Sequence, residues 1–136
     1  MRRALAAAAV VLVVLVACGP DNPNPAEEGS HNDPPQHTCE LANNLQREAT
    51  KVLSDIASGS PSGTQKDILD LGDATHAVLS GASRTTPLLG DLSAVYDDVS
   101  QLDDDFKSGN GDVNADAAAL RNDMTRLGMD CSKYLG

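Results

Sequence analysis

Four segments between residues 38 and 136 repeat apolar residues at alternating steps of three and four, and this periodicity constrains the fold more than any other feature of the chain. Such spacing gathers apolar side chains on one face of a helix, so it predicts four amphipathic helices around a shared core. No strand-like alternation of apolar and polar residues occurs. The predicted core positions, in chain order, are Leu41, Leu45, Ala49, Val52 and Ile56; Ile68, Leu71, Thr75, Val78 and Ala82; Leu88, Leu92, Val95, Val99, Leu102 and Phe106; and Val113, Ala117, Leu120, Met124, Leu127 and Cys131.

Short segments of turn-forming residues separate the predicted helices, at 58–63, 83–85 and 108–111. Short connections favour antiparallel neighbours. We therefore predict an all-α fold, a small antiparallel up-down four-helix bundle. The second segment is the weakest, because Gly72 and Gly81 each cost up to about 1 kcal/mol relative to alanine in a helix. A three-helix fold, with this segment irregular, is the alternative.

The residues at the start of each segment are typical of helix N-caps. Thr38, Thr86 and Asp112 stand where a side-chain oxygen can accept a hydrogen bond from a free backbone N–H of the first turn. Thr64 is followed three residues later by an acid, as in a capping box. These positions predict where the four helices begin.

The apolar run at the N-terminus ends in Leu15-Val16-Ala17-Cys18. Met1-Arg2-Arg3 provides a positive start, and the 14 apolar residues of Ala4–Ala17 are too few for a membrane span of about 20, so they fit a signal peptide. The final tetrapeptide resembles the lipobox of bacterial lipoproteins. This resemblance implies that residues 1–17 are a signal peptide that is removed, and that the Cys18 thiol carries diacylglycerol with acyl chains such as palmitate.

The resemblance also implies export, with the lipid holding the protein at the outer face of the bacterial cytoplasmic membrane, or at an outer membrane if the cell has one. An ordinary secretory signal with a nearby cysteine is the alternative. Residues 18–37 are rich in Pro, Asn, Asp and Glu and contain no large apolar side chain. Such a segment buries too little surface to offset its ordering entropy. We expect a disordered, lipid-anchored tether over 18–37 and the helical bundle domain over 38–136.

The three cysteines then take different roles. With lipid on Cys18, as the resemblance implies, Cys39 at the start of the first helix and Cys131 near the end of the fourth remain. Four antiparallel helices place these two at the same end of the bundle. Three helices would separate them by roughly 30 Å, far beyond the Cα–Cα distance of about 7 Å that a disulfide spans. Because disulfides persist in exported proteins, we expect a Cys39–Cys131 disulfide; two free thiols are the alternative.

The mature chain would be strongly acidic. The whole sequence holds 10 Lys and Arg against 20 Asp and Glu, and loss of Arg2 and Arg3 leaves 8 against 20, formally −12. This charge argues against nucleic-acid binding, which needs clustered basic residues. It also argues against adhesion of the protein surface to an anionic bilayer. Membrane attachment would therefore come from the covalent lipid, since two or more acyl chains hold a protein durably.

The acidic clusters are the best candidates for a metal site in the sequence. Asp112, Asn114, Asp116 and Asp123 partly match a calcium loop, but Ala117 occupies the position of its required glycine. A helix capped by Asp112 explains the same residues, and we prefer it. The aspartates at 103–105 are expected to be solvated surface charge, with weak cation binding as the alternative.

No pattern predicts catalysis. His76 shares a helix face with Asp73 and Ser80, but one exposed helix offers no oxyanion hole for a triad. His31 and His37 near Cys39 fit no standard zinc spacing, and the three aromatic residues are too few to line a sugar or nucleobase groove. We therefore expect no enzyme activity, no cofactor and no metal.

The leading hypothesis is a surface-exposed small lipoprotein whose helical module binds an unidentified protein or is associated with the envelope. A small-ligand or cation-binding lipoprotein, and an immunity or phage-exclusion lipoprotein, are the alternatives. Because Cys39 follows the tether, the far end of the bundle, at 58–63 and 108–111, and its acidic flanks are where a partner is expected.

Overall fold

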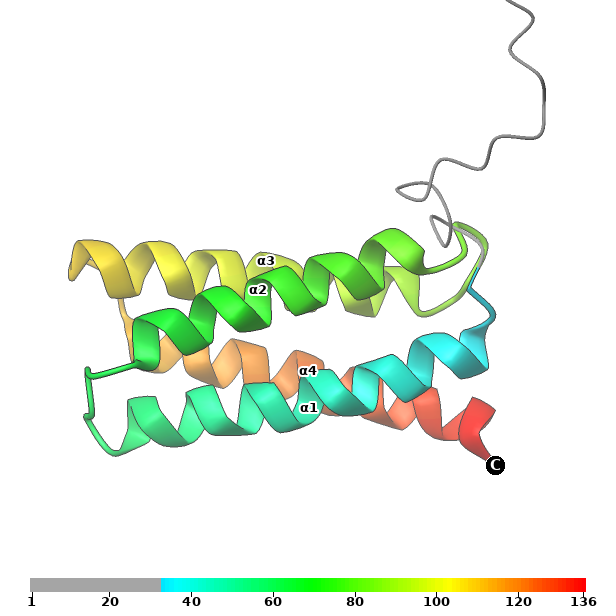
Figure 1. Ribbon diagram of the computed structural model, residues 1–136, viewed down its shortest axis with the longest axis horizontal. Helices are drawn as coiled ribbons and strands as arrows, with labels where there is room; N and C mark the ends of the chain where they lie inside the picture. The colour runs from blue at the N-terminus through cyan, green and yellow to red at the C-terminus, as the bar shows by residue number, and fades with distance from the viewer. Residues whose placement is uncertain (1–32) are drawn as a thin grey trace, which may run out of the picture.

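The computed structural model describes residues 33–136, and within them it contains four α-helices and no β-strand. Each helix runs antiparallel to the next, and each packs against two neighbours, so that α1 contacts α2 and α4 while α3 contacts the same two (Figure 1). The predicted up-down four-helix bundle is confirmed, and the three-helix alternative is wrong. The predicted signal peptide, Cys18 and residues 18–32 of the predicted tether lie outside the described residues. The helices are α1 (Pro35–Ala57), α2 (Thr64–Gly81), α3 (Leu89–Ser108) and α4 (Val113–Leu135).

Aliphatic side chains fill the core and follow the predicted register closely. In α4 the buried residues are the predicted ones from Ala117 to Cys131. In α1, however, Leu41 and Ile56 are only half-buried, while Cys39 and Ala42 face the core. The largest fully buried side chains, contributed by all four helices and by the residue before α3, are Leu45, Val52, Ile68, Leu71, Leu88, Leu92, Val95, Val99, Leu102, Leu120 and Leu127.

The first helix begins earlier than predicted. Pro34 holds the N-cap position and Pro35 starts α1, so residues 35–37, which the sequence assigns to the tether, belong to the helix. Proline fits the first helical position because its missing N–H is not needed there and its φ suits a helix. Thr38 is therefore not a cap; it lies inside α1, fully buried.

The capping box predicted for the second helix is also wrong. Gly63 is the N-cap of α2, with φ of +89°, a conformation that glycine adopts without steric cost. The Thr64 hydroxyl instead donates a hydrogen bond back to the Ser60 carbonyl.

Of the other two predicted caps, the one for α3 is wrong and the one for α4 is confirmed. α3 starts at Leu89, later than expected, although the Thr86 hydroxyl still accepts a 3.4 Å hydrogen bond from the Leu88 amide. Asp112 caps α4 as predicted, accepting a 3.0 Å hydrogen bond from the Ala115 amide.

The described chain begins and ends at the same end of the bundle (Figure 1). There the Asp33 amide donates a 3.0 Å hydrogen bond to the Gly81 carbonyl, which fixes the start of the chain beside the joint between α2 and α3. The joints from α1 to α2 and from α3 to α4 lie at the opposite end, which we call the far end. Across residues 33–136, no helix has the length and apolar content needed to cross a bilayer.

Candidate functional site

The two remaining cysteines close the bundle at the end where the described chain begins. Cys39 of α1 and Cys131 of α4 form a disulfide, with an S–S distance of 2.06 Å and a Cα–Cα distance of 5.3 Å. Both residues are buried. The structure therefore brings together the pair expected from the topology, while Cys18, the predicted lipid attachment site, lies outside the described residues.

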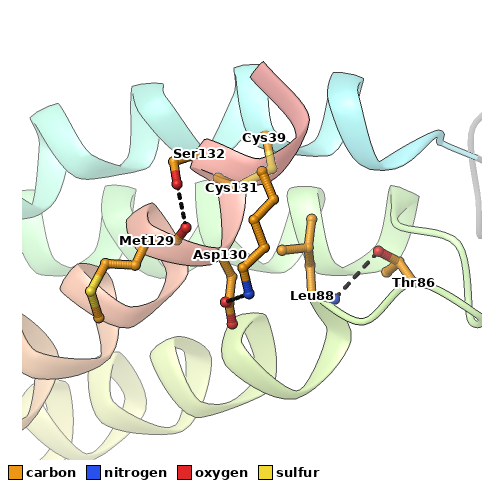
Figure 2. The surroundings of a disulfide bond; sticks show 8 residues. Cys39, Thr86, Leu88, Met129, Asp130, Cys131 and Ser132 are labelled. Carbon is orange, nitrogen blue, oxygen red and sulfur yellow. Dashed lines mark hydrogen bonds and ion pairs between the residues drawn. A yellow bond between two sulfur atoms is a disulfide. The ribbon is translucent and has the colours of Figure 1, made fainter. Parts of the chain in front are cut away.

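The last turns of α4 beside the disulfide are held by local hydrogen bonds (Figure 2). The Ser132 hydroxyl donates to the Met129 carbonyl at 2.6 Å, and Lys133 forms an ion pair with Asp130 at 2.5 Å. Met129 itself is 60% exposed. These contacts order the end of the helix.

An open hollow of about 360 Å³ lies at the far end of the bundle. Half-buried apolar side chains of Ile56, Phe106 and Val113 form part of its lining, together with Pro61 from the joint between α1 and α2. Asp105 adds a carboxyl group. The hollow is thus a shallow apolar surface with an acidic side, at the end of the bundle where a partner is expected.

A second hollow, of about 210 Å³, lies between α2 and α3 and is lined in part by His76. His76 is exposed, and its ring packs at a tilt against Tyr96 with the ring centroids 5.7 Å apart. Within residues 33–136 no hydrogen bond joins His76 to Asp73 or Ser80, so the three residues do not form a triad.

The three aspartates near the end of α3, at positions 103–105, have different surroundings. Asp103 pairs with Lys107 and accepts a hydrogen bond from Gln65. Asp104 is exposed, and the Asp105 carboxyl faces Asp116 of α4. Among residues 33–136, no three His, Cys, Asp or Glu side chains are grouped so that they could hold a metal ion.

The residues proposed for a calcium loop form a capped helix instead. Asp112 is the N-cap of α4, and residues 113–123 are helical. A calcium loop would need these oxygen ligands to converge from an open turn. The preferred interpretation from the sequence, a helix with a capping aspartate, is confirmed.

Three aspartate pairs bridge α3 and α4, and sequence reasoning missed them. The residues are seven apart on each helix, which is close to two helical turns, and the antiparallel helices bring them face to face. The seven-residue spacing of aspartates in both helices was the signal in the sequence that could have predicted the pairs. The sequence alone, however, does not show which face of α3 meets α4. We call these pairs the carboxyl ladder: Asp91–Asp130, Asp98–Asp123 and Asp105–Asp116.

The environment of the carboxyl ladder favours protonated carboxyls. Burial, followed by the facing Asp123 carboxyl, raises the pKa of Asp98 to about 6. Burial also raises the pKa of Asp91 and of Asp116, and in each case the facing acid raises it further. In the described structure, one oxygen of each of these three side chains is buried without a hydrogen-bond partner. A proton on such a carboxyl would turn it into a donor toward the acid that faces it.

Basic residues neutralise only part of the negative charge of the carboxyl ladder. The Arg126 Nε donates to Asp91 at 2.9 Å, and the same guanidinium contacts Asp123. The hydrogen bond from Lys133 lowers the pKa of Asp130. The charged groups that act on Asp116 are acids, Asp105 and Asp112. Of the three pairs, Asp105–Asp116 therefore has its negative charge offset least by basic residues.

Comparison of this chain with family models, curated proteins and solved structures found no match. Its function is therefore inferred from its own residues and geometry. The disulfide, the far-end hollow and the carboxyl ladder carry that inference.

Proposed function

We propose that this chain is an exported bacterial lipoprotein whose helical bundle acts as a non-enzymatic module that binds another protein of the cell envelope. In this proposal residues 1–17 are removed, Cys18 carries the lipid, and residues 18–32 connect the membrane to the bundle. The lipobox resemblance of Leu15-Val16-Ala17-Cys18 supports the anchor. The charge of the mature chain supports a lipid anchor over adhesion of the protein surface to an anionic bilayer.

The composition of the bundle interior is the observation that carries the proposal of a binding module. In residues 33–136 the buried polar or charged side chains are those of Thr38, Thr64, Thr75 and Thr86. Thr75 uses its hydroxyl within α2, donating to the Leu71 carbonyl at 2.7 Å. An enzyme site usually places titratable groups in a cleft that restricts water. Here the charged groups lie at or near the surface, which favours recognition by contact over chemistry.

The position of the disulfide supports a particular orientation. Cys39 lies in the second turn of α1, close to where the tether would join the bundle. The far end lies at the other end of the helices (Figure 1). Phe106 is part of the lining of its hollow. In the proposed arrangement the far end points away from the membrane and meets the partner.

The anchor is tested by replacing Cys18 with serine in cells fed an alkyne analogue of palmitate. We expect the label to disappear from the protein and the protein to leave the membrane fraction or keep its leader. Cys39→Ser is the matched control, because it removes a thiol from the bundle and should keep the label. Labelling of Cys18→Ser at the wild-type level would contradict the proposal.

The binding surface is tested by placing one photo-crosslinking amino acid at Ser60 or at Ser132. Both serines are exposed, but Ser60 lies in the joint between α1 and α2 at the far end, and Ser132 lies near the disulfide (Figure 2). In intact cells we expect a discrete protein adduct from position 60 and none from position 132. Adducts confined to position 132, or none from either position, would contradict the proposed orientation.

A further inference from the structure

We propose that the carboxyl ladder makes the interface between α3 and α4 proton-linked, so that the two helices hold together more strongly in a mildly acidic medium than at neutral pH. This device would operate whether or not the module binds a partner. It concerns the stability of the bundle itself, through six side chains of which Asp105 alone also lines the far-end hollow.

The first support is geometric. Asp91, Asp98 and Asp105 recur every seven residues along α3, so they lie in one row on the helix. Their partners recur at the same interval along α4, in the opposite direction. The carboxyl groups therefore meet in pairs along the whole seam, instead of scattering over the surface. Two ionised carboxylates in contact repel, whereas one shared proton replaces that repulsion with a charge-assisted hydrogen bond.

The second support is burial. One oxygen each of Asp91, Asp98 and Asp116 is buried without a partner in residues 33–136. A buried acceptor that lacks a donor destabilises the folded state. The facing carboxyl can provide hydrogen only when one member of the pair is protonated, so each pair meets its hydrogen-bonding need by taking up a proton.

The charged groups around the carboxyl ladder do not remove its tendency to take up protons. From α4, Arg126 contacts Asp91 and Asp123, and Lys133 pairs with Asp130. From α3, Asp97 adds negative charge beside Asp98.

The contacts described for α1 and α2 lie away from the carboxyl ladder. From α2, Gln65 contacts Asp103, and His76 packs on Tyr96. The ion pair between α1 and α2 joins Lys51 to Asp67 at 2.8 Å. None of these described contacts neutralises the Asp105–Asp116 pair, on which Asp112 also acts as a further acid.

The direction of the pH effect follows from the raised pKa values. A carboxyl whose pKa is higher in the folded than in the unfolded state binds more protons when folded, so stability increases as the pH falls through the folded value. For Asp98 the pKa is about 6 in the folded state, against 3.8 for an unperturbed aspartate. Between pH 7.5 and pH 5, this residue alone would change the unfolding equilibrium constant by at most about tenfold. Solvent screening of a half-buried group reduces that change.

The test compares urea denaturation of the full chain in detergent at pH 7.5 and pH 5, for the wild type, Asp98→Asn and Asp104→Asn. Both substitutions remove one negative charge from α3, but Asp98 faces α4 and Asp104 is exposed. We expect the wild type and Asp104→Asn to be more stable at pH 5. Asp98→Asn should be more stable than the wild type at pH 7.5, and its gain at pH 5 should be smaller.

A double variant extends the comparison. Asp98→Asn with Asp116→Asn should reduce the pH dependence further than Asp98→Asn alone, whereas the exposed pair Asp73→Asn with Asp104→Asn should leave it unchanged. Equal pH dependence in the ladder variant and the exposed control would overturn the proposal, as would a wild type that is less stable at pH 5 than at pH 7.5.

A measurement on the unmodified protein keeps the test independent of variant folding. The carboxyl carbon of Asp98, followed by carbon-13 NMR, should titrate with a midpoint well above that of Asp104. Identical midpoints for the two residues would overturn the proposal.

Discussion

Removing the disulfide should cost the bundle a large share of its stability. Cys39 and Cys131 are separated by 92 positions, so the bond closes nearly the whole described chain into one loop. In the chain-entropy model, a loop of this size lowers the entropy of the unfolded state enough to stabilise the fold by about 4.6 kcal/mol at 25 °C. Small domains unfold with a total free energy of about 5–15 kcal/mol. We therefore expect the variant with alanine at both positions to lose between a third and nearly all of its stability.

Urea denaturation followed by circular dichroism at 222 nm measures this loss. With a urea dependence of about 1.5 kcal/mol/M, the midpoint should fall by roughly 3 M. Both sulfur atoms lie in buried residues, so alanine also leaves a small void that adds to the loss. Cys39→Ala alone breaks the same bond and should match the double variant within about 1 kcal/mol. The control is Cys18→Ser, which should leave the midpoint unchanged.

A small effect would refute this reasoning. If the double variant lost less than about 1 kcal/mol, the unfolded chain could not be gaining the conformational freedom that the loop-entropy treatment assigns to it. Residual contacts between α1 and α4 in the unfolded state would then be the physical explanation.

Four further outcomes test individual features of the bundle. Gly72→Ala should stabilise α2 by about 0.5–1 kcal/mol, because a Cβ there would make an ordinary 3.5 Å contact with α3; a lower melting temperature would contradict this. Leu102→Ala should cost about 2–5 kcal/mol in urea denaturation, since the side chain is fully buried. Asp112→Ala should cost about 1 kcal/mol by removing the α4 cap, whereas Asp112→Ser should retain most of it. Below about pH 4 stability should fall again, because the hydrogen bond from Lys51 lowers the pKa of Asp67 and acid abolishes that ion pair; an equal change in melting temperature between pH 5 and pH 3 in the wild type and in Asp67→Asn would contradict this.

The sequence predicts the architecture well because apolar periodicity and short joints are local properties. In α4 the periodicity identifies the buried residues from Ala117 onward one by one, and Asp112 is correctly placed as the cap. α1 is less predictable at its start. Its first turn is built from Pro35 and from the buried Thr38, and neither residue type signals a core-facing helix. Pro35 is a local signal for a helix start, but the burial of Thr38 depends on packing against the other helices.

The carboxyl ladder could not be derived from the sequence for a different reason. The seven-residue steps of Asp91, Asp98 and Asp105 are visible in the sequence, but a row of acids on a helix is usually solvent-exposed. Only the rotation of α3 against α4 turns those residues toward Asp123 and its neighbours. That rotation depends on how Leu92, among others, packs in the core, which is information from the whole bundle.

The position of the disulfide also determines how the bundle responds to mechanical force. A pull on the chain ahead of Asp33 reaches Cys39 after little more than one turn of α1. From there the tension divides, because the disulfide passes part of it to α4. A load applied between this end and the far end is thus shared by two covalently joined helices lying side by side. When the pull acts on the chain before Cys39 and after Cys131, the disulfide carries the tension past the whole loop between them, so that only the few residues outside the loop can be extracted without breaking a covalent bond.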